Sequence, residues 1–125
     1  MELPFDVKGQ IIYYVGPCPA VPGRVIGPAG PTTSGRMDAY SLRLIEKGLA
    51  CMIGKGMRND TVINSMICHG AVYLAAEGGS AALISKKVIS ETHCFRGPWY
   101  GGGAPAESAE SSCYYSGRQL WLQLL

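Results

Sequence analysis

The sequence predicts an α/β domain, and two patterns support this prediction. Between residues 10 and 90, three short apolar segments alternate with three segments whose apolar residues recur at helical spacing. Glycines bound most of these segments, as expected where strands and helices end. A repeated order of strand and helix is typical of sheets whose later strands are joined by helical crossovers.

Length and composition support one small domain, or a piece of a larger one, and exclude several classes of protein. The chain has 125 residues, of which 47% are hydrophobic and 16% charged, which argues against disorder over most of its length. Its 11 basic and 9 acidic side chains are too balanced for binding to a nucleic-acid backbone. The longest apolar runs fall well short of the ~20 residues that span a membrane, and the first residues lack the pattern of a signal peptide. We therefore expect a cytoplasmic protein that binds neither nucleic acid nor membrane.

The five cysteines give no support for a metal site in this chain. No pair shows the CxxC spacing of zinc or thioredoxin-like motifs. Without a secretory signal, we expect reduced thiols rather than disulfides.

The first part of the predicted domain runs from a strand to a helix. Residues 10–15 are rich in β-branched and aromatic residues and end at a Gly-Pro pair, which predicts a buried strand. Residues 18–31 are rich in proline and glycine and predict a long loop, with a short edge strand at residues 24–26. Three consecutive hydroxyl residues, 32–34, are N-cap types, so we expect a helix from there to Gly48.

The second part repeats this order. A helix is expected to begin at Asn59 or Asp60 and to end at His69-Gly70, where the glycine suits a helix terminus. After Ser90 the periodic pattern is lost. The remaining elements expected are strands at residues 49–53 and 71–75 and a third helix at residues 80–89.

The segment Gly27–Tyr40 is the strongest candidate for a binding site. It is a Gly/Pro loop that leads into a helix start, where free N–H groups and the helix dipole favour anions. Arg36 can hold a carboxylate through two parallel hydrogen bonds. The alternative is a plain capped helix, with Arg36 solvated or paired to Asp38 or Glu46.

A second candidate follows the next strand. Lys55 stands between two glycines at a strand end, where α/β proteins place ligand-binding groups. The alternative is an ordinary turn lysine. Because both loops follow consecutive strands, the sequence favours one anion site shared between them.

These segments resemble a known family. The match begins with residues 4–19, from Pro-Phe-Asp-Val-Lys-Gly-Gln to Gly-Pro-Cys-Pro, and includes the specific block Gly-Pro-Thr-Thr-Ser-Gly-Arg-Met-Asp at residues 30–38. Gly-Lys-Gly at 54–56 and Gly-Gly at 78–79 continue it. The chain thereby resembles, over residues 4–90, the β subunit or C-terminal domain of iron–sulfur-dependent class I fumarate hydratases and L(+)-tartrate dehydratases.

The resemblance implies a hydro-lyase that hydrates fumarate to malate or dehydrates tartrate. It implies a swivelling β/β/α domain, a partner α subunit or N-terminal domain that carries a [4Fe–4S] cluster, and a dimer of αβ units. No residue of this chain would ligate the cluster, and the chain alone would be inactive. Thr32 resembles the family's proton-transfer threonine. Residues implied to bind the dicarboxylate substrate are Thr33, Ser34, Gly35, Arg36 and Lys55.

Two departures from the family pattern lead to a hypothesis about the ends. Family β parts begin earlier, so residues 1–90 are expected to be a partial catalytic domain. Residues 91–125 do not match, but codons regrouped after a one-base shift near residue 91 can spell the family's continuation. We hypothesise that this tail is a frameshifted, poorly structured product, which sequencing the DNA of codons 85–125 tests. Two alternatives remain: a non-catalytic carboxylate-binding module and a non-functional fragment.

Overall fold

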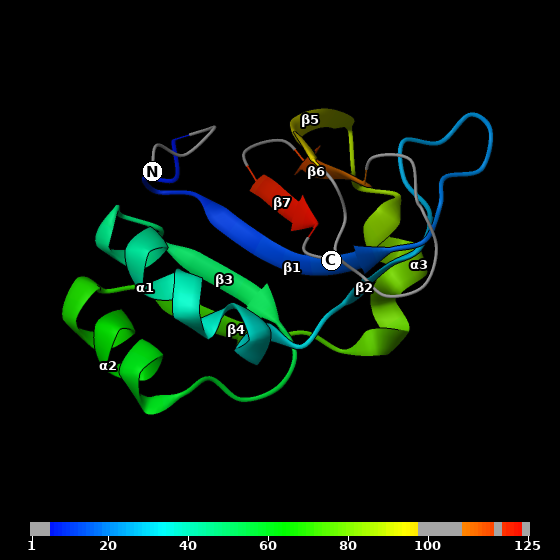
Figure 1. Ribbon diagram of the computed structural model, residues 1–125. Coiled ribbons are helices and arrows are strands. Elements are labelled where there is room, and N and C mark those ends of the chain that lie inside the picture. The colour runs from blue at the N-terminus through cyan, green and yellow to red at the C-terminus, as the bar shows by residue number, and fades with distance from the viewer. Residues whose placement is uncertain (1–5, 98–108, 117–118, 124–125) are drawn as a thin grey trace.

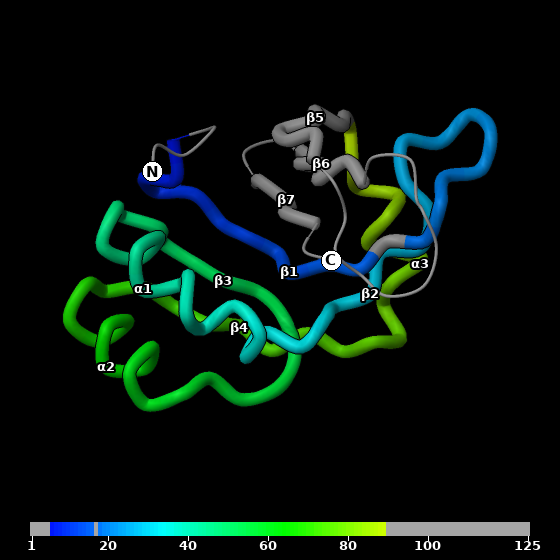
Figure 2. Tube along the Cα trace, viewed as in Figure 1, coloured from blue at the N-terminus to red at the C-terminus, as the bar shows by residue number. Residues whose placement is uncertain are grey.

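A computed structural model describes residues 6–97, 109–116 and 119–123 (Figures 1 and 2). Its helical segments are η1 (Ser34–Met37), α1 (Asp38–Glu46), α2 (Asp60–His69), η2 (Gly78–Ser80) and α3 (Ala81–Ser85), where η marks a 3₁₀ turn. Its strands are β1 (Ile11–Pro17), β2 (Ala29–Pro31), β3 (Cys51–Gly54), β4 (Val72–Ala75), β5 (Ser90–Gly97), β6 (Ala109–Ser116) and β7 (Gln119–Gln123).

The strands form one mixed sheet in the order β4-β3-β1-β7-β6-β5, with β2 paired to the end of β1. Strands β1, β3 and β4 are parallel neighbours, joined by α1 and α2. Strand β7 is parallel to β1, whereas the β7–β6 and β6–β5 pairs are antiparallel. The predicted α/β class and the helical crossovers between the early strands are confirmed.

Two hydrophobic clusters lie on opposite faces of the sheet, because side chains alternate along β1. Ile12 and Tyr14 point to one face, where α1 and α2 contribute Ile45 and Val62. Their neighbour Tyr13 points to the other face, toward α3. Figure 1 shows α1 and α2 together and α3 apart from them.

Most predicted elements between residues 10 and 75 are confirmed. Strand β1 and helix α2 lie where expected, and the Asn59 side chain caps α2 by accepting a hydrogen bond from the N–H of Val62 (2.9 Å). Gly48 and Gly70 follow α1 and α2, both with positive φ. Local patterns were sufficient for these elements because each has its own start or stop signal.

The predicted edge strand at residues 24–26 is wrong. The loop is closed instead by two backbone hydrogen bonds, from Cys18 N–H to Pro28 O (2.9 Å) and from Gly27 N–H to Cys18 O (3.2 Å). These bonds bring residues 29–31 beside the end of β1, so the pairing strand is β2. The loop projects beyond the end of β1 in Figure 2.

The third helix is shorter than predicted. Helix α3 covers only five residues, Ala81–Ser85, and is preceded by the turn η2. After it, Lys87 N–H bonds to Ile84 O (2.9 Å), and Val88 is buried in the second cluster. Val88 N–H likewise bonds to Ser85 O (3.4 Å), so the hydrogen bonds after α3 span three residues and the α-helical pattern ends before residue 89.

Three strands, β5, β6 and β7, follow residue 89. Residues 98–108, 117–118 and 124–125 lie outside the described residues. The division at residue 90 and the frameshift hypothesis stay predictions. Among the described residues, no helix is long and apolar enough to cross a membrane.

Candidate functional site

The backbone brings the two candidate loops side by side. Thr33 and Lys55 form an isolated parallel bridge. The N–H of Ser34 donates to Lys55 O (2.9 Å), and the N–H of Lys55 donates to Thr32 O (3.2 Å). On its other side, Thr32 N–H donates to Tyr14 O (2.9 Å), which ties this segment to β1. Main-chain hydrogen bonds therefore hold the two loops in register.

The side chains presented by these loops differ in exposure. Thr33, Arg36 and Lys55 are exposed, whereas Thr32 and Gly35 are half-buried. Within the described part of the chain, Arg36 and Lys55 make no ion pair or side-chain hydrogen bond. The alternative in which Arg36 pairs with Asp38 or Glu46 is therefore wrong. Two uncompensated cations lie on neighbouring loops, an arrangement that attracts anions.

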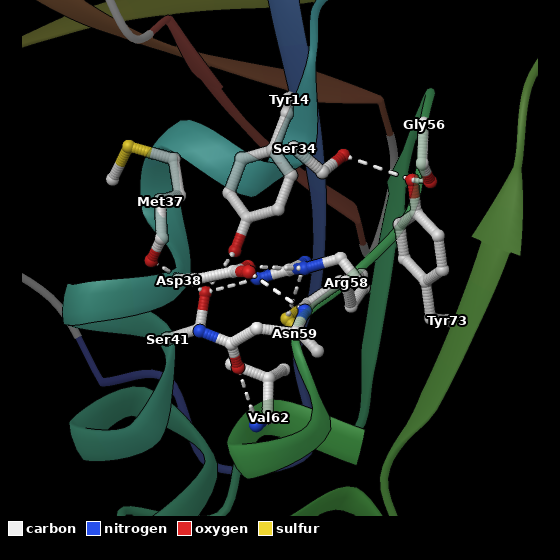
Figure 3. A network of polar contacts seen from close by, with 11 residues as sticks. Tyr14, Ser34, Met37, Asp38, Ser41, Gly56, Arg58, Asn59, Val62 and Tyr73 are labelled. Carbon is white, nitrogen blue, oxygen red and sulfur yellow. Dashed lines mark hydrogen bonds and ion pairs between the residues drawn. The ribbon is translucent and has the colours of Figure 1, made fainter.

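Ser34 occupies a different place from the other predicted site residues. Its side chain is fully buried, and its hydroxyl lies 3.0 Å from the Tyr73 hydroxyl. The Tyr73 hydroxyl also donates to the carbonyl oxygen of Gly56 at 3.0 Å, and Figure 3 shows Tyr73 next to Ser34 and Gly56. Since a hydroxyl has one hydrogen, Tyr73 can donate to Gly56 while Ser34 donates to Tyr73. The predicted substrate contact of Ser34 stays a prediction. In the structure, its hydroxyl is linked through the Tyr73 hydroxyl to Gly56 on the Lys55 loop.

Two glycines make this close packing feasible. A Cβ at Gly54 would overlap Ser34 Oγ, so only glycine fits beneath the buried serine. Gly56 has a φ of +86°, in a region of backbone conformation that residues other than glycine rarely adopt. Lys55 is thus held between two positions that require glycine.

The hydroxyl residues 32–34 supply an N-cap position as predicted, but without a side-chain cap hydrogen bond. Thr33 stands at the N-cap of η1, but its side chain makes no cap hydrogen bond. The Ser34 peptide N–H already has an acceptor in Lys55 O, and its hydroxyl is bonded to Tyr73. The bridge between the loops replaces the cap, and the α-helix α1 begins four residues later at Asp38.

A buried ion pair lies beneath the loops (Figure 3). Arg58 is 6% exposed, and its Nε donates to Asp38 Oδ1 at 2.6 Å. The second carboxylate oxygen of Asp38 accepts from the backbone N–H of Asn59 (2.9 Å). Both charges are buried, so each depends on the other for compensation.

The rest of the Arg58 guanidinium is enclosed by polar and aromatic groups. Nη2 donates to Ser41 Oγ (2.5 Å), which also contacts the Tyr14 hydroxyl (3.2 Å) and donates to Met37 O (2.8 Å). The rings of Tyr14 and Tyr73 lie on the guanidinium, with their centroids 5.4 and 5.3 Å from Arg58 Cζ. These are cation–π distances. We call Arg58, Asp38, Ser41, Tyr14 and Tyr73 the Arg58 network.

Sequence reasoning missed the Arg58 network. One signal was present in the sequence: Asp38 lies on the apolar side of its helix, in phase with the buried residues Ser41 and Ile45. A buried carboxylate needs a buried cation. Nothing in the spacing identifies Arg58 as that cation, because the two residues are 20 positions apart.

Burial also shifts two ionisable groups outside this network. It raises the pKa of Tyr13 to about 12, and the Tyr13 hydroxyl donates to Ala29 O (3.1 Å). Burial likewise raises the pKa of the Cys51 thiol, which keeps it protonated at neutral pH. Neither group is suited to act as a nucleophile.

The described side chains do not fit an iron–sulfur cluster or a metal ion. The cysteines among them, Cys18, Cys51 and Cys68, lie on a loop, a strand and a helix. No three His, Cys, Asp or Glu side chains of this part of the chain gather closely enough to hold a metal. No chemical step is therefore assigned to a cluster in this chain.

Known proteins with similar sequences are fumarate and tartrate enzymes. The chain is 39% identical over 101 residues to the anaerobic class I fumarate hydratase of Escherichia coli K12, which covers 80% of this chain and 18% of that protein. It is 38% identical over 100 residues to fumarate hydratase 2 of Leishmania major, in an alignment that covers 79% of this chain and 18% of that protein. A putative L(+)-tartrate dehydratase β subunit of Methanocaldococcus jannaschii is 37% identical over 90 residues, which make up 70% of this chain and 46% of that protein.

The chain spans less than a fifth of the length of these fumarate hydratases. The sequence model of the family described as Fumarase C-terminus matches residues 1–101, which extends beyond residue 90, where the resemblance was expected to end. The resemblance found in the sequence is confirmed, and the chain belongs to the Fumarase C-terminus family.

Proposed function

We propose that this chain supplies the substrate-carboxylate contacts and a proton-transfer threonine to a hydro-lyase that acts on fumarate or tartrate. The observation that carries the proposal is the pair of exposed cations, Arg36 and Lys55, on two loops joined by main-chain hydrogen bonds. A dicarboxylate has two negative ends, and two separate cations match them. The fold proposed for the complete protein is the swivelling β/β/α domain.

Thr32 is the proposed catalytic residue. Its N–H and C=O are both used by the bridge to β1 and to Lys55, so its backbone is fixed. Its half-buried hydroxyl makes no hydrogen bond to another described residue. Hydration adds a hydroxyl group to one alkene carbon and a proton to the other, and the Thr32 hydroxyl is suited to exchange that proton. Its carboxylate counterpart is proposed to lie on the partner.

Around Thr32, we assign Thr33, Gly35, Arg36 and Lys55 to substrate binding. Arg36 offers a fork that pairs with one carboxylate, and Lys55 offers a point charge for the other. The proposed partner is an α subunit or N-terminal domain that carries the [4Fe–4S] cluster. A cluster iron with an open coordination position would act there as a Lewis acid.

Reconstitution with a cluster-bearing α subunit tests the proposal. We expect fumarate hydration or tartrate dehydration by the complex, and loss of that activity in Thr32→Ala. The matched control is Thr61→Ala, an exposed threonine on α2. Equal activity in the two variants, with Thr32→Ala folded, would contradict the role of Thr32.

The same assay distinguishes the remaining alternatives. Binding of fumarate by the chain without turnover in any complex would favour a non-catalytic carboxylate-binding module. Insoluble protein both alone and in complex would favour a non-functional fragment.

A further inference from the structure

The Arg58 network connects the two loops that carry the proposed substrate contacts. The Arg58 guanidinium binds Asp38 and Ser41 at the start of α1, the helix that follows Arg36. The backbone of Arg58 belongs to the segment that follows Lys55. Any movement of α1 relative to the Lys55 loop therefore lengthens charge-assisted hydrogen bonds inside the protein, where they are strong.

Tyr73 extends this connection up to the loops themselves (Figure 3). Its ring lies on the Arg58 guanidinium, and its hydroxyl lies between Ser34 and Gly56. Ser34 belongs to the Arg36 loop and Gly56 to the Lys55 loop. One buried cation thus supports both loops, through a helix on one side and through a tyrosine on the other.

We infer that Arg58 is a positioning residue that fixes the span between Arg36 and Lys55, and thereby selects dicarboxylates over monocarboxylates. This inference rests on the proposed function, in which those two cations each bind one carboxylate. A dianion must reach both cations at once, so its affinity depends on their separation. A monoanion meets one cation at a time and is insensitive to the span.

The test compares the affinities of the full chain for fumarate and for acetate. Each affinity is measured from the changes in amide chemical shifts during a titration. Arg58→Lys keeps the charge but loses the planar fork that binds Asp38 and Ser41 together. We expect this variant to bind fumarate about tenfold more weakly, as for one lost charge-assisted bond, and to bind acetate as the wild type does. The matched control is Arg43→Lys, an exposed arginine on α1. Unchanged fumarate affinity, or an equal loss for both anions, would overturn the inference.

Amide hydrogen exchange separates the inference from the proposed function. The N–H groups of Ser34 and Lys55 form the hydrogen bonds that join the loops. We expect both to exchange about tenfold faster in Arg58→Lys than in Arg43→Lys, without any ligand. Wild-type chain that binds fumarate no better than acetate would contradict the proposed function, and exchange would still report on positioning. Unchanged exchange would contradict positioning by Arg58.

A second variant decides the matter where Arg58→Lys does not fold. Tyr73→Phe keeps the ring on Arg58 and removes only the hydroxyl that joins Ser34 and Gly56. We expect about threefold weaker fumarate binding, as for one neutral hydrogen bond, with acetate binding unchanged. Tyr40→Phe, which alters a tyrosine that is 62% exposed, is the control. Equal fumarate affinity in the two variants would overturn the inference.

Discussion

Arg36 and Arg58 carry the same guanidinium group in opposite surroundings. Arg58 is 6% exposed and bonded to a carboxylate, a hydroxyl and a sulfur atom, between two aromatic rings. Arg36 is exposed, and no described residue pairs with it. Each guanidinium nitrogen of Arg58 donates a hydrogen bond within the domain, whereas no described residue accepts a hydrogen bond from the Arg36 side chain. The difference gives Arg58 a structural role and leaves Arg36 available for the proposed carboxylate contact.

The largest expected effect is on stability, from Arg58→Met. Removal of the cation leaves the Asp38 carboxylate buried without compensation, which costs about 3–5 kcal/mol. Arg36→Met should change the free energy of unfolding by less than about 0.5 kcal/mol, because its side chain is on the surface. Urea unfolding of both variants measures the contrast.

A double variant sharpens that measurement. Because the cost of Arg58→Met comes from the charge left behind, Asp38→Leu in the same chain should recover a large part of the loss. No recovery would mean that the aromatic packing of Arg58, and not its pairing with Asp38, stabilises the fold.

The second effect is on substrate binding, and here we expect substitution of Arg36 to be costly although it leaves stability almost unchanged. In the reconstituted complex, Arg36→Met should weaken dicarboxylate binding by about 1.5–3 kcal/mol, the value of a charge-assisted contact. This weaker binding should be measured as a higher KM for fumarate or tartrate. An unchanged KM would remove Arg36 from the site and leave Lys55 as its remaining cation.

A smaller effect is expected at the start of α2, next to the Arg58 network. Asn59→Ala removes the side-chain cap on the Val62 N–H and should destabilise the domain by about 1 kcal/mol. Asn64→Ala, at an exposed position within α2, is the control and should be close to neutral. Thermal unfolding distinguishes the two, and equal melting temperatures would contradict a contribution from the cap.

The last effect appears only at high pH, on the other face of the sheet. Burial raises the pKa of Tyr13 from 10.0 to about 12, so the folded state retains a proton that the unfolded state loses above pH 10. The contribution of protonated Tyr13 to the free energy of unfolding is therefore fully present below pH 10 and is lost as pH rises toward 12. Unfolding by urea at pH 9 and pH 11 should show a larger loss of stability in the wild type than in Tyr13→Phe. Parallel losses would mean that Tyr13 titrates normally.

The fold and the loops were predictable to different degrees. Strand β1, helix α2 and the glycine ends of both helices follow from local signals within a few residues. The Gly-Lys-Gly and Thr-Thr-Ser-Gly-Arg segments also stand out locally. The bridge from Thr33 to Lys55 and the pairing of Arg58 with Asp38 join residues far apart in sequence, and no periodicity encodes such contacts. The short strand within loop 18–31 was misplaced at residues 24–26 for the same reason, since the backbone hydrogen bonds of the loop determine that residues 29–31 pair with β1.

The bridge between Thr33 and Lys55 also has an evolutionary consequence. Its hydrogen bonds come from peptide groups, which every residue except proline can supply. The exposed side chains of Thr33 and Lys55 can therefore be exchanged while the backbone frame stays in place. A new substrate preference can arise by single substitutions on this frame, without a new fold around it.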